Sequence, residues 1–292
     1  MTNRQLDLFI TLSASDVVTK HSRDLMERCW FNLSKNKRSK EIYHQTKNGD
    51  WCRVRGGDYG IATIWDMNVL LFATSHIVDR INKGENVSPM IRFSGYEFQH
   101  FIGAKKHSGQ LDKDLQKALE RLHTTRIETN IRLPDNVRKY QSFYWINRVD
   151  KWVENGRVIG YAMELPKWYF DTIVNHKQIL TIDDDYFNIR GGIEKFLYLW
   201  CRKSVGYRKD YWKESFISLH KKSSSIGTLR AFTFSLRKII KKQSIHNYYL
   251  KEKENYLYVR RCDDKEKLLL ELDTECASVK ESIAHSVSSS GE

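Results

Sequence analysis

The sequence has no apolar run that approaches the roughly 20 residues a membrane-spanning helix needs. Its most apolar stretch, residues 69–78, is interrupted by polar side chains. The short apolar segment at residues 8–14 follows Asp7 too closely to be a signal peptide. The sequence therefore predicts a cytoplasmic protein that has no membrane among its partners.

Cysteines are also few and far apart. The five are Cys29, Cys52, Cys201, Cys262 and Cys276. They form no C-x-x-C pair and no alternating Cys/His cluster, so neither a disulfide framework nor a zinc finger is expected. We expect reduced thiols with structural roles.

Signatures of catalysis are missing as well. The sequence contains no G-x-x-x-x-G-K-[ST] phosphate loop. It also lacks the two histidines one residue apart with which rolling-circle initiators hold a metal. Asp183, Asp184 and Asp185 form the one dense carboxylate cluster, and two-metal nucleases use such groups. Three consecutive acids on a strand cannot all face one site, however, and aspartates are favoured in turns. We therefore predict no enzymatic activity and no cofactor.

Positive charge is plentiful, and one segment carries most of it. The 292 residues have a net charge of +13, with 40% hydrophobic and 12% aromatic residues, which is typical of a folded basic protein. Residues 202–243 hold twelve Lys or Arg against two acids. Residues 263–292 reverse this balance, with eight acids against three lysines, and predict an acidic helix followed by a disordered tail. An anionic partner is expected to meet the basic segment.

Within that segment, residues 227–243 hold five basic side chains and no acidic one. Helical spacing separates their apolar and basic residues onto opposite faces. The apolar stripe is Leu229, Phe232, Leu236, Ile239 and Ile240; the outer face is Arg230, Phe234, Arg237, Lys238 and Lys241, with Thr233 at the border. One face predicts burial in a core, and the other predicts contact with an anion.

The first half of the chain predicts a helix, a helix-turn-helix and then strands. The long helix begins at a Thr63 to Asp66 capping signal and ends at Gly84. A short helix over 94–103 and a helix over 110–123 follow. Strands are expected over 125–133, 142–149 and 157–165, the last two joined by an Asn-Gly hairpin signal.

The second half repeats this order from Gly191 onward. Helices are expected over 191–206 and 213–222, and the basic helix follows the turn at 223–228. The strands 245–250 and 256–261 then form a hairpin with a charged tip. A helix-turn-helix followed by a hairpin is the order of a winged helix, whose second helix lies in the major groove.

We therefore predict an α+β protein with two tandem winged-helix (helix-turn-helix plus β-hairpin) domains. The expected organisation is a flexible N-terminal arm at 1–24, a first winged-helix domain at 25–165, a second at 166–262, and an acidic, partly disordered tail at 263–292.

A basic amphipathic helix alone also fits a membrane surface or a calmodulin target, and a charged helix face is often only solvated. Here the neighbouring helix and hairpin use the apolar stripe, which leaves the basic face for double-stranded DNA. The expected contacts are to phosphates and base edges. For Phe234, contact with a thymine methyl and packing against the hairpin remain alternatives. The candidate DNA-binding residues of the second domain are Lys222, Ser224, Ser225, Thr228, Arg230, Thr233, Phe234, Arg237, Lys238 and Lys241.

The corresponding helix of the first domain is mixed in charge. Its cations Lys113, Lys117 and Arg121 are offset by nearby acids. We expect this helix to bind phosphates weakly or to serve in dimerisation, while the helix at 228–242 reads most of the bases.

Five ordered motifs resemble the replication initiator protein A family of bacterial plasmids, over about residues 24–261. The motifs are DLMERCWFNLSKNKR, YGIATIWDMNVLLFATSHI, ELPKWYFDTIVN, GGIEKFLYLW and SFISLHKKSSSIGTLRAFTFSLRKII. The resemblance implies two winged-helix domains that bind repeated origin sequences (iterons), open an adjacent AT-rich region and recruit the host replicative helicase. It also implies a bacterial protein associated with its plasmid in the nucleoid, and many similar initiators form a homodimer and repress their own promoter. One departure is the turn KSSSIG, which has less glycine than the family pattern.

A winged-helix transcriptional repressor without initiator activity remains the alternative, because the fold does not decide between them. Residues 5–9, QLDLF, resemble the motif by which polymerases and some plasmid initiators bind the host sliding clamp. In that case Leu8 and Phe9 would enter an apolar pocket and Gln5 would bind its edge, with Leu6 also in the motif; otherwise these apolar residues only cap the first domain.

Overall fold

The structure is a computed structural model of the chain. It describes residues 8–11, 30–35, 41–45, 51–132, 138–174, 179–205, 210–263, 266–267 and 269–270. The predicted tail, Gln5, Leu6, Cys29 and Cys276 lie wholly or largely outside these residues.

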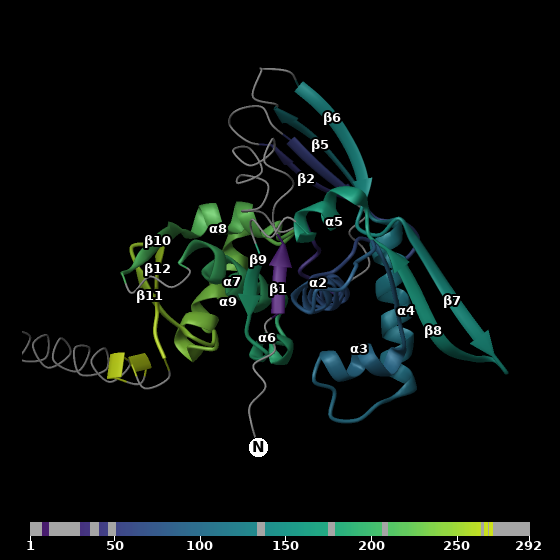
Figure 1. The fold of residues 1–292 in the computed structure, drawn as a ribbon. Helices are drawn as coiled ribbons and strands as arrows, with labels where there is room; N and C mark the ends of the chain where they lie inside the picture. The colour runs from purple at the N-terminus through teal and green to yellow at the C-terminus, as the bar shows by residue number, and fades with distance from the viewer. Residues whose placement is uncertain are drawn as a thin grey trace, which may run out of the picture.

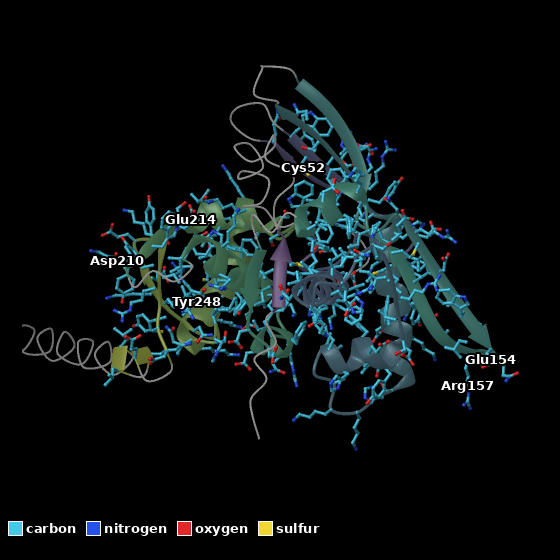
Figure 2. The ribbon with its side chains drawn as sticks, viewed as in Figure 1. Cys52, Glu154, Arg157, Asp210, Glu214 and Tyr248 are labelled. Carbon is cyan, nitrogen blue, oxygen red and sulfur yellow. The ribbon has the colours of Figure 1, made fainter. Side chains whose placement is uncertain are left out.

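The first unit consists of three helices and a three-stranded antiparallel sheet. The helices are α2 (Met67–Asn82), α3 (Gly95–Phe101) and α4 (Gly109–Thr124), and the strands are β4 (Met90–Phe93), β7 (Arg148–Glu154) and β8 (Arg157–Glu164) in the order β4-β8-β7. The turn between β7 and β8 is Asn155-Gly156, with φ angles of 49° and 74°. The Asn-Gly hairpin prediction is confirmed, since such a turn needs positive φ at both positions. Glu154 and Arg157 flank it at the far end of this hairpin (Figure 2).

The second unit repeats the same succession. Its elements are α7 (Gly192–Ser204), β10 (Trp212–Ser215), α8 (Phe216–Ser223), α9 (Leu229–Lys242), β11 (Tyr248–Lys253) and β12 (Tyr256–Arg261), with strand order β10-β12-β11. In both sheets the last strand along the chain lies between the other two. The predicted repeat of elements is thus present, and it extends to the order of the strands. The helix expected over 213–222 is wrong at 213–215, because these residues form β10 and α8 begins at Phe216.

The first unit has a second sheet, whose strands the sequence pattern did not distinguish from those of the β7-β8 hairpin. Strands β2 (Glu41–Gln45), β3 (Trp51–Arg55), β5 (Arg126–Arg132) and β6 (Arg138–Tyr144) form a second sheet, in the order β2-β3-β5-β6, which extends away from the helices (Figure 1). The single strand expected over 142–149 is therefore wrong. Residues 142–144 end β6, Trp145 and Ile146 are buried in the core, and residues 148–149 begin β7.

A two-stranded sheet lies between the units. Strand β1 (Leu8–Thr11) pairs antiparallel with β9 (Ile179–Ile182), and β1 also packs along α2 (Figure 1). The expected flexible arm is corrected at these four residues, because their backbone groups have partners in β9. Helix α6 (Asp185–Asn188) follows β9.

Helix α5 (Lys167–Val174) follows the predicted domain boundary but packs against α2 of the first unit. The hydroxyls of Tyr169 and Thr74 are 3.1 Å apart in the core. Residues 167–174 therefore pack with the first unit, although the sequence assigned them to the second.

The units share one continuous apolar core. A Cβ atom added to Gly192, at the start of α7, would lie 2.0 Å from the carbonyl oxygen of Leu33. Only glycine lets the two backbones approach this closely. Cys52, Cys201 and Cys262 are buried free thiols, as predicted for the described cysteines. Among the described helices, none has the length and apolar character that crossing a bilayer requires.

Candidate nucleic-acid interface

Helix α9 is held firmly at both ends. The Thr228 hydroxyl accepts a hydrogen bond from the backbone N–H of Ala231 at 3.3 Å, which caps the first turn. At the other end Gln243 adopts φ 47°, and its side-chain amide makes two hydrogen bonds to the backbone of Leu250 in β11. These contacts fix the helix relative to the hairpin that follows.

The apolar stripe of α9 is buried over most of its length. Phe232, Leu236 and Ile239 are buried, and Ile240 is half-buried. Leu229 differs from the prediction, because it lies in the first turn and is 38% exposed. The central three residues therefore attach the helix to the core.

The opposite face of α9 is exposed. Arg230, Arg237, Lys238 and Lys241 all face solvent, and Thr233 lies at the border as expected. Phe234 is 61% exposed, and the Lys238 Nζ lies 4.3 Å from the centre of its ring. Its ring stands in solvent beside a cation, which does not fit the alternative of packing against the hairpin.

Arg237 differs from its neighbours because the hairpin holds its guanidinium. Nε and Nη2 donate to the Glu252 carboxylate at 2.8–3.1 Å, and Nη2 also donates to Asn255 Oδ1 at 3.1 Å. Hydrogen bonding to Glu252 raises the pKa of Arg237 above its usual value. The edge formed by Nε and Nη2 is occupied, so a bidentate base contact through it would require Glu252 to move. Helical periodicity could not identify Glu252 as a partner, because it lies 15 residues further along the chain.

The turn before α9 contains both exposed and occupied candidates. Lys222 forms an ion pair with Glu214 of β10, and Ser224 is buried with φ 57°. Ser225 is half-buried, and its N–H donates to the Ser223 hydroxyl. Thr228 remains at the surface. The DNA-binding roles of these four residues stay predictions, and the structure leaves Thr228 the most accessible.

In the first unit, α4 presents Lys113 and Lys117 to solvent. Arg121 instead turns inward, where Nε and Nη2 donate to the two oxygens of Asp66, each at 2.6 Å. Asp66 also accepts the N–H of Thr63 at 2.7 Å, and α2 begins at Met67. The Asp66 side chain is only 3% exposed, so this pair joins α4 to the start of α2. Arg121 therefore has a structural contact that its spacing in the sequence does not reveal.

Of the residues proposed to bind the clamp, Leu8 and Phe9 lie in β1, opposite Ile182 and Thr181 of β9. Binding them to a partner through their strand edge would compete with this pairing. Clamp docking through Gln5, Leu6, Leu8 and Phe9 stays a prediction.

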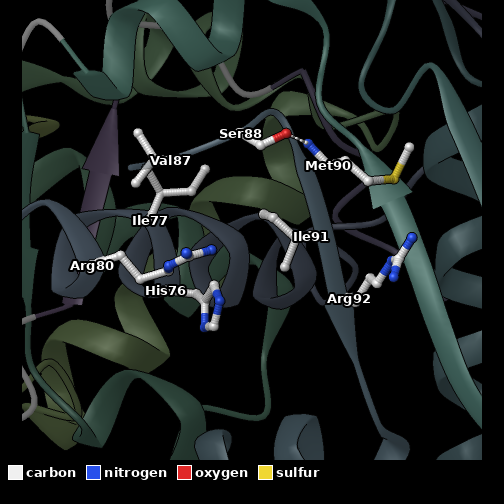
Figure 3. Close-up of a pocket in the computed structure, with 8 residues that line it drawn as sticks. All are labelled: His76, Ile77, Arg80, Val87, Ser88, Met90, Ile91 and Arg92. Carbon is white, nitrogen blue, oxygen red and sulfur yellow. Dashed lines mark hydrogen bonds between the residues drawn. The ribbon is translucent and has the colours of Figure 1, made fainter. Parts of the chain in front are cut away.

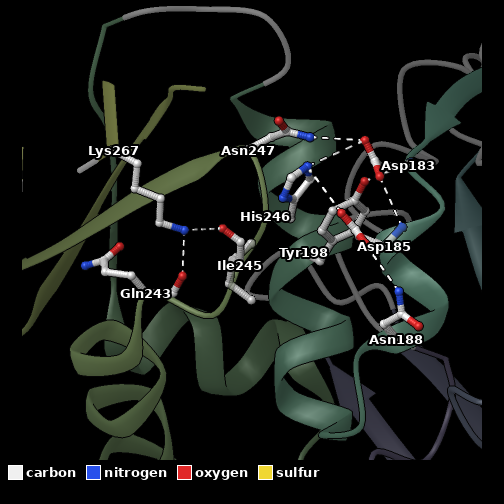
Figure 4. A network of polar contacts seen from close by, with 9 residues as sticks. All are labelled: Asp183, Asp185, Asn188, Tyr198, Gln243, Ile245, His246, Asn247 and Lys267. Carbon is white, nitrogen blue, oxygen red and sulfur yellow. Dashed lines mark hydrogen bonds and ion pairs between the residues drawn. The ribbon is translucent and has the colours of Figure 1, made fainter. Parts of the chain in front are cut away.

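The aspartate cluster forms a polar junction with the loop after α9 (Figure 4). Ligand atoms of Asp183, Asp185 and His246 lie within 4.8 Å of one another. Asp183 accepts hydrogen bonds from the backbone of Asp185 and the side chain of Asn247, and His246 Nε2 lies 3.4 Å from Asp185. Burial, with the neighbouring carboxylates, raises the pKa of Asp184. These contacts join the segment after β9 to the loop after α9 of the second unit.

A pocket of about 390 Å³ lies between α2 and β4 (Figure 3). Arg80, Arg92 and His76 are among its lining residues, with Ser88 and apolar side chains. Arg80 donates to Glu85 at 2.8 Å, and burial together with Arg80 lowers the pKa of His76. Glu85 thus offsets part of the positive charge at this pocket.

The fold of the chain is similar to that of solved structures. The chain resembles crystal structures of domains 2 and 3 of RctB, with a TM-score of 0.53 at 15% identity, covering 82% of this chain and 97% of that one. A selenomethionine derivative of the same domains gives a TM-score of 0.60 at 13% identity, with coverages of 80% and 95%. At such identities the likeness concerns the fold.

Sequence comparison is more specific. A protein of Wigglesworthia glossinidia brevipalpis that is named for replication is 34% identical over 200 residues, which cover 66% of this chain and 70% of that protein. The family model described as replication initiator protein A matches residues 20–250. The chain therefore belongs to the replication initiator protein A family.

Proposed function

We propose that this protein initiates plasmid replication by binding repeated origin sequences in double-stranded DNA, mainly through α9. The observation that carries the proposal is the outer face of α9, which has exposed cations and no acid, while the inner face is buried. Membership of the family supports the role in replication.

The repeated order of elements supports a tandem winged-helix interpretation of both units. In each, a short helix and a longer one precede a hairpin whose last strand pairs with a strand just before the short helix. In such an arrangement the longer helix, α4 or α9, is the one that enters a major groove. The proposal assigns no catalytic step and no cofactor.

The cations on the outer face of α9 differ in whether another side chain already holds them. Arg230, Lys238 and Lys241 are exposed, and no ion pair within the described residues holds them. They are suited to phosphates or guanine edges, and the exposed ring of Phe234 is suited to a thymine methyl. Arg237 would be aimed by Glu252 and Asn255, with Nη1 as its open edge. We propose that Arg121 supports the fold instead of contacting DNA.

The test combines footprinting on the parent replicon with a strand-opening assay. Wild type should protect repeated sequences and open the adjacent AT-rich region. Arg230→Ala/Lys238→Ala should lose both, whereas Lys113→Ala/Lys117→Ala, which removes the same charge from α4, should retain most of both. Protection without opening would favour the repressor alternative, and equal losses in the two variants would contradict the main role of α9.

Recruitment of the host sliding clamp is a second proposal, which can be tested separately. Homodimerisation and recruitment of the helicase are further proposals that rest on the family resemblance. Gln5→Ala is the most useful variant for the clamp, because Leu8 and Phe9 also pair with β9. Loss of host-clamp retention in a pull-down, with duplex binding intact, would support docking. Equal retention by wild type and variant would contradict it.

A further inference from the structure

The outer face of the β10-β12-β11 sheet has an unusual composition. Strand register places Lys213 and Lys251 on either side of Tyr258, and Ser215 and Lys253 on either side of Tyr256. Arg260 lies in the next row, paired with Tyr249. Rows of lysine and tyrosine therefore cross all three strands.

Burial identifies this face as the one directed away from the helices. Leu250, Leu257 and Val259 alternate with the residues above and are buried in the core. Lys213, Lys251 and Lys253 are exposed, and Tyr256 is 39% exposed. The basic-aromatic face, defined as Tyr211, Lys213, Lys251, Lys253, Tyr256, Tyr258 and Arg260, is thus open to solvent over most of its rows.

The basic-aromatic face contains no carboxylate in its rows. Glu214 and Glu252 have the opposite parity along their strands and are held by Lys222 and Arg237 of the helical layer. Within the described part of the chain, no ion pair neutralises Lys213, Lys251, Lys253 or Arg260, and the Arg260 side chain hydrogen-bonds Tyr211 of the same face. The three lysines therefore give this face a net positive charge that an anion can approach from solvent.

The β2-β3-β5-β6 sheet shows that such residues need not attract a ligand. On its corresponding face, Arg53 and Arg55 pair with Glu41, and Arg126 pairs with Glu128. Each of these arginines has a carboxylate partner within the fold, and the two acids offset most of their three positive charges. Among the described residues, no such pairing offsets the lysines of the basic-aromatic face, so their charges are available to a partner.

We propose that the basic-aromatic face binds single-stranded DNA. The Lys213 Nζ lies 5.2 Å from the ring centre of Tyr256, and the Arg260 Cζ lies 5.8 Å from that of Tyr211, which is 45% exposed. Single-stranded DNA binds to cations through its phosphates and stacks its unpaired bases on aromatic side chains. Cations beside exposed rings on a sheet provide both kinds of contact. A duplex keeps its base faces covered, so it would not use the tyrosines in this way.

The site is separate from the outer face of α9. The helices α8 and α9 contact β10 and β11 from the other side of the sheet (Figure 1). The protein can therefore bind a duplex at α9 and single-stranded DNA at the sheet at the same time. The inference does not require α9 to bind the duplex, because the two ligands are measured independently.

The test uses the full chain and fluorescence anisotropy with a labelled oligo-dT of about 16 nucleotides and a duplex of origin sequence. Tyr211→Ala/Tyr256→Ala should weaken oligo-dT binding at least about tenfold, since two rings no longer stack on bases. Lys251→Gln/Lys253→Gln should weaken it and flatten its salt dependence. Both variants should bind the duplex within about twofold of wild type.

Lys238→Gln/Lys241→Gln is the matched control, because it removes the same charge from α9. It should weaken duplex binding and leave oligo-dT binding unchanged. Tyr211→Phe/Tyr256→Phe keeps the rings and should bind oligo-dT like wild type, which separates stacking from a folding defect; thermal melting checks that each variant folds.

Three results would overturn the inference. They are failure of wild type to bind oligo-dT, wild-type binding of oligo-dT by the alanine variant, and equal losses for oligo-dT and duplex in the sheet variants. The last result would make the sheet an ordinary part of the duplex interface. Loss of duplex binding by the α9 variant alone bears on the proposed function and leaves the sheet result standing.

Discussion

Helices α4 and α9 occupy the same place in the two units, yet they present different surfaces. On α4, Lys113 and Lys117 are exposed beside acids of the same helix, and Arg121 turns inward to Asp66. On α9 the outer face has no acid, and its one engaged arginine is held by the neighbouring hairpin. A shared order of elements therefore does not imply an equal part in binding.

Replacing Arg121 by Ala should have the largest effect on the fold around α4. Its partner Asp66 would be left buried, so we expect the free energy of unfolding to fall by about 3–5 kcal/mol. Urea unfolding measures this, with Lys117→Ala as the exposed control on the same helix, for which a change within about 0.5 kcal/mol is expected. Wild-type stability of the Arg121 variant, together with weaker DNA binding, would instead make Arg121 a DNA contact.

The first helices of the two units differ as well, because the buried residues of α2 include no ionisable side chain, whereas those of α7 include Lys195. Lys195 of α7 is 1% exposed, its Nζ donates to the Tyr186 carbonyl at 2.9 Å, and burial lowers its pKa to about 7. The unfolded chain then binds more protons than the folded one between pH 7 and about 10, so stability should rise with pH there, by at most about 1.4 kcal/mol per pH unit.

Urea unfolding of wild type and Lys195→Met across this range tests the prediction. The variant lacks the titrating group, so its advantage over wild type should grow as the pH falls from about 10 to 7 and level off below that. Parallel pH profiles for the two proteins would show that Lys195 keeps an ordinary pKa in the folded state.

Glu252→Gln tests how the hairpin controls the one engaged arginine of α9. The change removes a carboxylate beside the helix and frees the guanidinium of Arg237. We expect affinity for non-specific duplex to rise by about two- to fivefold, with less discrimination in favour of origin repeats. Competition binding with origin and random duplexes measures both. Lower affinity for both duplexes would show that Glu252 serves DNA binding in another way.

Local patterns predicted the elements well because the residues that decide them are close in sequence. Phe232, Leu236 and Ile239 repeat at helical spacing and are buried, and Asn155-Gly156 forms the turn expected of it. The five family motifs also identified the family that sequence comparison supports.

Contacts between distant residues could not be predicted in the same way. The pairing of β1 with β9 joins residues far apart in the chain. The sheet that holds β5 and β6 is likewise decided by distant contacts, because β5 pairs with β3 and β6 then pairs with β5. At the site, the partners of Arg121 and Arg237 are acids 55 and 15 residues away. Periodicity shows which face of a helix is polar, but tertiary structure decides which of its charges remain available.

The salt dependence of binding to an origin duplex shows whether α9 supplies the cations that meet DNA phosphates. For wild type, log K should fall linearly with log salt by roughly 0.9 for each phosphate that the protein neutralises. Arg230→Ala/Lys238→Ala should reduce the slope by roughly 0.9 for each phosphate that the removed side chains neutralise. Lys113→Ala/Lys117→Ala should change it less. A slope that is flat in wild type, or reduced equally by the two variants, would contradict the account that α9 provides the main DNA-binding surface.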